Sequence, residues 1–126
     1  MSTLKSGGIQ DLTELFLRDN NIRDISALSK LYNLTNIDMW GNKVNDINAL
    51  SELFKLKILT MGCNEINDIS ALDNLTNLLF LQLYNNKISD ISSLRNLTNL
   101  TEVDLMGNEI TDWSPVSHVE YVWKTW

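Results

Sequence analysis

The sequence predicts a repeat solenoid of five 22-residue units, each of which adds one short strand to a common sheet. Asparagine recurs with an unbroken spacing of 22 residues, and columns of aspartate and of aliphatic residues repeat in the same phase. In each unit two apolar residues, two positions apart, precede the asparagine, a pattern typical of a strand that enters a turn. Because one unit cannot bury its own apolar edge, the columns indicate that neighbouring units cover one another.

The predicted organisation is one domain in three consecutive parts. Residues 1–11 form an N-terminal lead without a full helical cap, residues 12–113 form the repeats, with the last unit running into the tail, and residues 114–126 form a closing segment rich in aromatics. Two interpretations of the closing segment stay open: a cap that folds over the last coil, and a free peptide that docks elsewhere. The cap is favoured because the terminal repeats of a solenoid need covering.

The aliphatic columns are predicted to form the core. One of them, which leads into the strands, comprises Leu34, Leu56, Leu78, Leu100 and Val122. The asparagine column is predicted to lie inside the turns, where its side-chain amides bond backbone groups that would otherwise be buried without partners. This structural ladder comprises Asn20, Asn42, Asn64, Asn86 and Asn108.

The aspartate column has two interpretations. Five carboxylates stacked at about 4.8 Å could supply oxygen ligands to calcium, but the sequence contains no clustered Gly-and-Asp calcium loop. Each aspartate precedes an Ile-x-x-Leu or similar segment and can instead cap a short helical turn, so no metal site is predicted. The column comprises Asp24, Asp46, Asp68, Asp90 and Asp112.

Charge and composition exclude several classes of function. The net charge is −6 and the ten Lys and Arg residues are scattered, so the chain lacks the basic footprint that nucleic-acid binding requires. No apolar run approaches the roughly 18 residues of a membrane span, and residues 1–10 do not form a signal peptide. The chain as it stands is therefore expected to be cytoplasmic, and no cofactor is expected.

A catalytic role is not predicted either. Cys63 and His118 are single copies of their residue types and could be imagined as a nucleophile and its base. Their repeat positions, however, place them on different edges and two units apart. No pair of carboxylates stands in a recognisable acid–base arrangement, so the sequence favours a binding protein over an enzyme.

The repeat resembles a known family. Residues 74–78 and 96–100 both read Asn-Leu-Thr-Asn-Leu, and residues 88–92 read Ile-Ser-Asp-Ile-Ser. These segments are similar to the 22-residue leucine-rich repeats of bacterial internalins and phosphatase-regulating repeat proteins, over residues 12–122. The resemblance implies an α/β solenoid: a right-handed arc with a parallel sheet on its concave side and short 3₁₀ turns on its convex side. It also implies protein binding through the concave face, in a family that is often secreted or surface-bound.

The outward strand positions are where a binding site is predicted, because they are free of core duties. Period-2 alternation produces three rows on the concave face. The first row is Glu14, Asn36, Ile58, Phe80 and Glu102; the second is Phe16, Asp38, Thr60, Gln82 and Asp104; the third is Arg18, Trp40, Gly62, Tyr84 and Met106. Gly62 is predicted to leave an open slot, with walls about 10 Å apart, into which a partner's side chain could insert.

The residues predicted to contact a partner are the second and third rows without Gly62, together with Phe80. Trp40, Tyr84 and Arg18 are the predicted anchors, because these residue types are the commonest binding hot spots. The sequence thus predicts a recognition module for a protein or peptide, and the acidic charge favours a partner with a basic patch. The alternative is a structural or self-associating protein that stacks through its uncapped N-terminal end.

Overall fold

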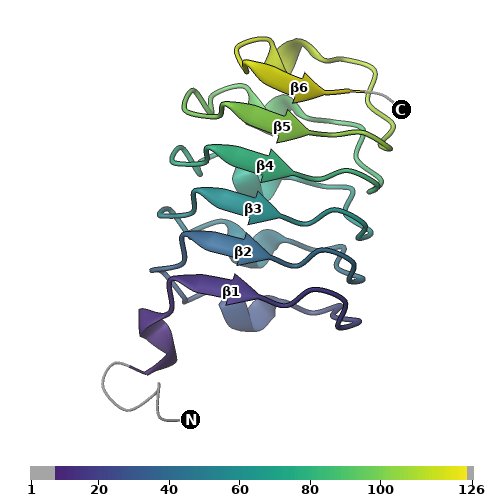
Figure 1. Ribbon diagram of the computed structural model, residues 1–126. Helices are drawn as coiled ribbons and strands as arrows, with labels where there is room; N and C mark the ends of the chain where they lie inside the picture. The colour runs from purple at the N-terminus through teal and green to yellow at the C-terminus, as the bar shows by residue number, and fades with distance from the viewer. Residues whose placement is uncertain (1–7, 125–126) are drawn as a thin grey trace.

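The structure, a computed structural model, describes residues 8–124 and contains one six-stranded parallel sheet. The strands follow one another in chain order from β1 to β6, as Figure 1 shows. Each strand has three residues, and bonds to the next coil continue beyond it, for example from the N–H of Leu17 to the carbonyl of Asp38. The strands are β1 (Glu14–Phe16), β2 (Asn36–Asp38), β3 (Ile58–Thr60), β4 (Phe80–Gln82), β5 (Glu102–Asp104) and β6 (Tyr121–Trp123).

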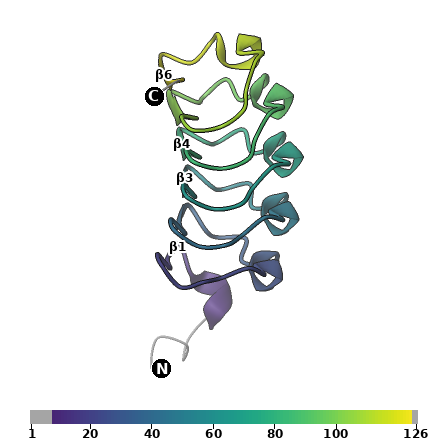
Figure 2. The same ribbon diagram turned by 90° about the vertical axis from the view of Figure 1, so that its right-hand side faces the viewer.

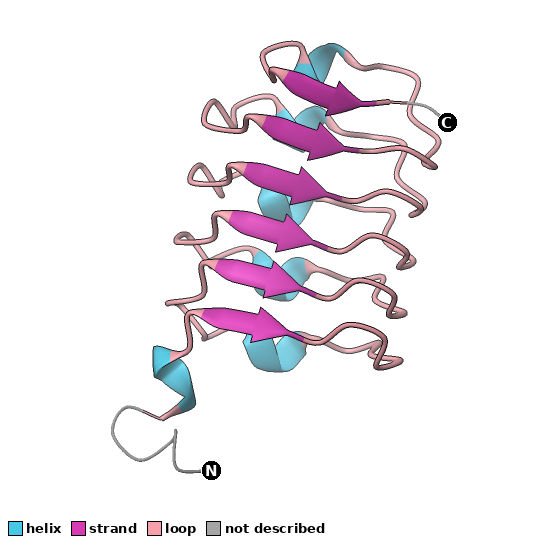
Figure 3. Ribbon diagram, in the orientation of Figure 1, coloured by secondary structure: helices cyan, strands magenta, loops and turns pink. Residues whose placement is uncertain are grey.

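Each strand is followed by a three-residue 3₁₀ helix on the opposite side of the coil, except that β6 is the last element described (Figure 3). These helices are η3 (Ser26–Leu28), η4 (Asn48–Leu50), η5 (Ser70–Leu72), η6 (Ser92–Leu94) and η7 (Ser114–Val116), and η2 (Ile9–Asp11) precedes β1. Figure 2 shows the strands on the concave side of an arc and the helices on its convex side. The predicted repeat solenoid is confirmed. No helix in residues 8–124 is long and apolar enough to cross a membrane.

The core consists of the aliphatic columns, which stack between the sheet and the 3₁₀ helices. In the central coils these side chains are completely buried, as for Leu59, Leu72 and Leu78. Burying a side chain of this size stabilises the fold by about 2 kcal/mol relative to an exposed one. At the N-terminal end Leu12 and Leu15 are only half-buried, because within the described residues no coil precedes the first one.

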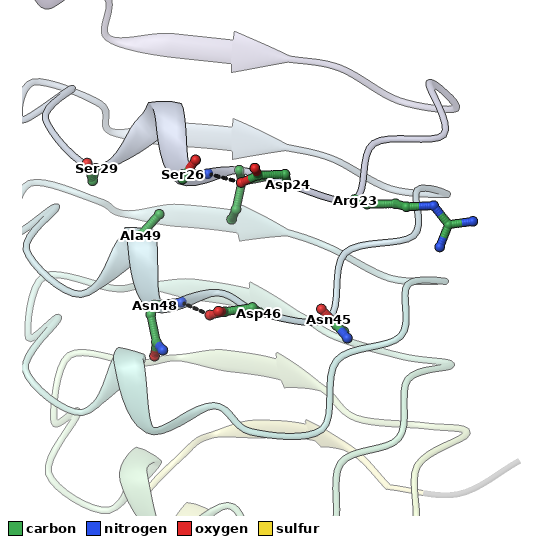
Figure 4. A pocket seen from close by; sticks show the side chains of 9 residues that line it. Arg23, Asp24, Ser26, Ser29, Asn45, Asp46, Asn48 and Ala49 are labelled. Atoms are coloured by element: carbon green, nitrogen blue, oxygen red, sulfur yellow. Dashed lines mark hydrogen bonds between the residues drawn. The ribbon is translucent and has the colours of Figure 1, made fainter.

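The convex turns begin with the aspartate column. Asp68 accepts a hydrogen bond of 2.9 Å from the backbone N–H of Ser70, and the same bond forms in all five coils. Figure 4 shows it for Asp24 and Asp46. The backbone N–H of Ser70 lowers the pKa of Asp68 below its ordinary value, because a carboxylate that accepts such a bond is favoured over the neutral acid. Each aspartate thus satisfies a backbone donor that the 3₁₀ helix leaves free.

The last coil differs from the sequence prediction. The closing segment was expected to lie outside the repeats, but η7 and β6 complete a sixth coil, and β6 pairs parallel with β5. Val122 is predicted to belong to the column that leads into the strands, yet it is the middle residue of the edge strand β6 and pairs with Val103. The reason is that Tyr121 pairs with Glu102 after 19 residues (121 − 102), whereas each earlier coil takes 22 (36 − 14).

This shortened coil also decides between the two interpretations of the closing segment, as far as it is described. Residues 121–123 are a strand of the sheet, so this part is not a free peptide. Lys124 lies with its Nζ 5.7 Å from the centroid of the Trp113 ring at the open end of the coil. Residues 125 and 126, the end of the predicted closing segment, lie outside the described residues.

Candidate binding surface on the concave face

The concave face is formed by the outward side chains of the six strands and of the residues that follow them. Strand register places the first two predicted rows in line, since Phe80 pairs with Glu102 and Gln82 with Asp104. Phe16 is 59% exposed and Phe80 is 44% exposed. Single exposed apolar side chains are ordinary on protein surfaces, whereas several of them on one face indicate a contact surface.

Two aromatic residues extend these rows beyond the sequence prediction. Tyr121 continues the first row beside Glu102, and Trp123 continues the second beside Asp104. They are 57% and 51% exposed. These two residues lie outside the 22-residue period from which the rows are predicted. The alternation Tyr-Val-Trp nevertheless indicates a strand with one buried residue.

The third row contradicts the predicted slot at Gly62. Trp40 Nε1 donates a hydrogen bond of 2.5 Å to the hydroxyl of Tyr84, and this bond spans two coils above Gly62. Gly62 is buried, and a Cβ added there would lie 3.0 Å from Tyr84 Cε2 and 3.2 Å from Trp40 Cδ1. The slot is therefore closed. Strand spacing sets the distance between the backbones of Trp40 and Tyr84, but two long side chains can lean toward each other across a glycine.

Arg18, in the first coil, contacts Asp38 and Trp40. Its Nε donates a hydrogen bond of 2.6 Å to Asp38 Oδ2, and its Cζ lies 5.8 Å from the centroid of the Trp40 ring. The hydrogen bond to Asp38 raises the pKa of Arg18. We call Arg18, Asp38, Trp40 and Tyr84 the concave bridge, since they form one chain of contacts across the sheet.

A hollow of about 190 Å³ lies beside the bridge on β3, β4 and β5. Its lining includes Thr60, Phe80, Gln82, Glu102 and Asp104. Burial raises the pKa of Asp104, and the neighbouring charge of Glu102 acts in the same direction. The Oε1 atom of Gln82 is buried and has no hydrogen-bond partner in the described part of the protein.

The asparagine ladder supports the turns that follow the strands. Asn64 Nδ2 donates to the carbonyls of Met39 and Met61, both at 3.0 Å, and its Oδ1 accepts from the N–H of Val44. Asn42, Asn86 and Asn108 make the corresponding bonds. Asn20 is exposed, and its Nδ2 donates only to the carbonyl of Arg18. The ladder is thus part of the scaffold beneath the third row.

The remaining candidate groups do not form a reactive site. Cys63 follows β3, and its Sγ lies 3.6 Å from Asn85 Nδ2. His118 lies in the last coil, where Nε2 is hydrogen-bonded to the carbonyl of Leu97 at 2.9 Å. Residues 8–124 contain no group of three or more His, Cys, Asp or Glu side chains that could hold a metal ion. A wider hollow of about 590 Å³ lies on the convex side, between the turns around η3 and η4, away from the concave rows (Figure 4).

The repeat geometry matches a protein family. A family model described as leucine-rich repeats in two copies matches residues 10–52 and 76–118. The chain belongs to the leucine-rich repeat family. Among curated proteins, none is significantly similar to it.

Two solved structures are similar to this leucine-rich repeat protein over nearly its whole length. Internalin C2 from Listeria monocytogenes is 37% identical with a TM-score of 0.88, and the match covers 93% of this chain and 53% of that one. An internalin of the same species, InlF, is 35% identical with a TM-score of 0.86, and the match covers 96% of this chain and 39% of that one. The repeats are of the bacterial internalin-like type, and this chain spans about half of the first structure and two-fifths of the second.

The fold is therefore that of a protein-interaction module. Leucine-rich repeat proteins of the internalin-like type are typically non-enzymatic.

Proposed function

We propose that this leucine-rich repeat protein binds a protein or peptide on its concave face. The observation that carries the proposal is the placement of exposed aromatics. Among the described residues, seven large hydrophobic side chains are exposed, and four of them project from strands of the sheet. These four are Phe16, Phe80, Tyr121 and Trp123. Aromatic side chains offer large contact areas at low cost in conformational entropy, which suits them as binding anchors.

The concave bridge supports this role as a rigid platform rather than as an open slot. Trp40 and Tyr84 are held by their mutual hydrogen bond, so little side-chain freedom remains to be lost on binding. Arg18 keeps a side chain that is 58% exposed at the edge of the platform. Thr60, Gln82 and Met106 provide polar and flexible contacts between the aromatic groups.

Charge on the same face favours a partner with a basic patch. Arg18 neutralises Asp38, but Glu14, Glu102 and Asp104 have no basic partner within ion-pairing distance in the described range. Placing a lysine or arginine of the partner beside Glu102 and Asp104 would relieve their mutual repulsion. Phe80 at the wall of the hollow would pack against the aliphatic stem of that side chain.

The experiment is affinity capture from the source organism or its host with three matched proteins. The native chain is compared with a Phe80→Ala, Trp123→Ala double variant, and with an Asn67→Ala control on the opposite side of the coil. We expect one partner to be captured by the native chain and the control but lost by the double variant, at equal thermal stability. Equal capture of that partner by all three proteins would show that the concave assignment is wrong.

A second candidate function is self-association through the N-terminal end of the described residues, where apolar side chains are partly exposed. Ile9 is 54% exposed, and Leu12, Leu15 and Leu17 are only partly buried. A second copy stacked on this end would bury them. Sedimentation velocity over a hundredfold range of concentration tests this function: a size that rises with concentration in the native chain, but not in an Ile9→Glu variant, supports it.

A further inference from the structure

One edge of the solenoid carries two exposed aromatic side chains that the repeat does not require. Tyr32 is 48% exposed and Phe54 is 52% exposed. They occupy the same position in consecutive coils, 22 residues apart, in the segments that enter β2 and β3. The equivalent residues of the other regular coils are all polar: Gln10, Thr76 and Thr98. A polar residue therefore suffices for the fold at this position, and the aromatics need another explanation.

The two aromatics belong to segments of consecutive coils that are bonded to each other. Lys55 Nζ donates a hydrogen bond of 2.8 Å to Asn33 Oδ1, and the N–H of Lys57 donates to the carbonyl of Thr35 at 2.8 Å. Tyr32 precedes Asn33 and Phe54 precedes Lys55, so each aromatic residue is next in sequence to one partner of this bond. These segments enter the strands on the left in Figure 1 and are separate from the concave rows.

Lys55 does not make the side-chain bond to the preceding coil's backbone that other coils make at this position. Three other coils have asparagine at its position, and each donates to the backbone carbonyl of the preceding coil, as Asn77 does to Phe54 at 2.7 Å. Lys55 instead bonds an asparagine side chain and leaves its ammonium group at the surface. The replacement removes a regular inter-coil bond and adds a positive charge.

The edge is locally basic in an acidic protein. Residues 31–35, 53–57 and 75–79 contain Lys55 and Lys57 but no Asp or Glu, while the whole chain has a net charge of −6. At the border, Lys30 and Glu52 occupy the same position in consecutive coils, and Asp11 lies at the position of Asn33 in the preceding coil. Positive charge beside exposed aromatic rings is complementary to an acidic ligand with an apolar side chain.

We propose that Tyr32, Phe54, Lys55 and Lys57, the aromatic–lysine patch, bind an acidic peptide segment of another protein. An apolar side chain of the segment packs on the two rings, and flanking Asp or Glu carboxylates accept hydrogen bonds from the two ammonium groups. This site is additional to the concave face and selects the opposite charge. The protein would then hold two partners, or two parts of one partner, on adjacent surfaces.

The repeat supplies the variants that test the patch. Tyr32→Thr with Phe54→Thr restores the residue found in two other coils, and Lys55→Asn with Lys57→Thr restores the residues that neighbouring coils carry. Other coils carry these residues at the same positions, so we expect the variants to keep the fold, and thermal melting checks their stability. Thr98→Ala, at the equivalent position of a distant coil, is the matched control.

The probe is a synthetic peptide, acetyl-Glu-Glu-Phe-Glu-Glu-amide, titrated into isotope-labelled native protein and followed by amide chemical shifts. We expect shifts confined to residues 30–35 and 52–57, and the same shifts in the control. Each double variant should bind about tenfold more weakly, which corresponds to a loss of about 1.4 kcal/mol. A lysine-for-glutamate version of the peptide should not bind. Equal affinity of native and variant proteins overturns the proposal, as do shifts that appear without peptide when the protein itself is concentrated, since these would identify a second copy as the occupant.

Discussion

The asparagine ladder allows a quantitative prediction for Asn64→Ala. The substitution removes the acceptor of the Val44 N–H, and Val44 is completely buried, so water cannot replace the lost partner. The carbonyls of Met39 and Met61 lose one donor each but keep a bond from another asparagine of the ladder. An orphaned buried donor costs about 1–3 kcal/mol, and each lost bond costs up to about 1 kcal/mol. We therefore expect a loss of about 3 kcal/mol in the free energy of unfolding.

Asn20→Ala is the internal control because it removes the same side chain at the same repeat position. Asn20 is exposed and donates only to the carbonyl of Arg18, where water can take its place. Its loss should cost less than about 1 kcal/mol. The difference between the two variants isolates burial and bonding from the intrinsic preference of the residue.

Urea unfolding followed by circular dichroism measures both variants. The midpoint of Asn64→Ala should fall while the slope stays unchanged, since the surface exposed on unfolding is the same. Equal destabilisation by the two substitutions, or a smaller effect at Asn64, would refute the reasoning that buried inter-coil bonds stabilise the turns.

Three further predictions follow from the other contacts. Gly62→Ala should push apart Trp40 and Tyr84 and cost about 1–3 kcal/mol by overpacking, seen as a shifted indole N–H resonance of Trp40 and a lower melting temperature. Asp68 and Asp90 have lowered pKa values, so the stability they contribute is present at neutral pH and lost as the pH falls through those values; a variant with Asn at both positions should show a weaker loss of stability in acid titrations. Deleting the chain from the start of β6 should lower the melting temperature, because β5 and its apolar column would lose their cover; unchanged stability would contradict the role of the sixth coil.

Much of the fold could be predicted because it depends on periodicity. The 22-residue spacing aligns equivalent residues of successive coils, and the register of β1 with β2 through β4 with β5 follows it without exception. The aspartate bonds to the convex turns also follow from local sequence, since donor and acceptor are two residues apart. The phase of the strands likewise placed Phe16 and Phe80 on the outer face.

The features that sequence reasoning missed depend on side-chain conformation or on a change of spacing. Whether Gly62 leaves a slot depends on the rotamers of Trp40 and Tyr84, which are residues of different coils and have no fixed relation in sequence. The shortened last coil breaks the period, so Tyr121 and Trp123 could not be found by extending the columns. Both features change the concave face, where the candidate anchors lie.

The number of regular coils, their register and the residues that fill their core follow from the sequence alone, because each of these repeats along the chain and depends on the burial of apolar columns. The cover over Gly62, the two aromatics that β6 adds to the sheet, and the bond between Lys55 and Asn33 become visible only in the tertiary structure. These decisions belong to contacts between coils, whose energies depend on how particular side chains pack in space.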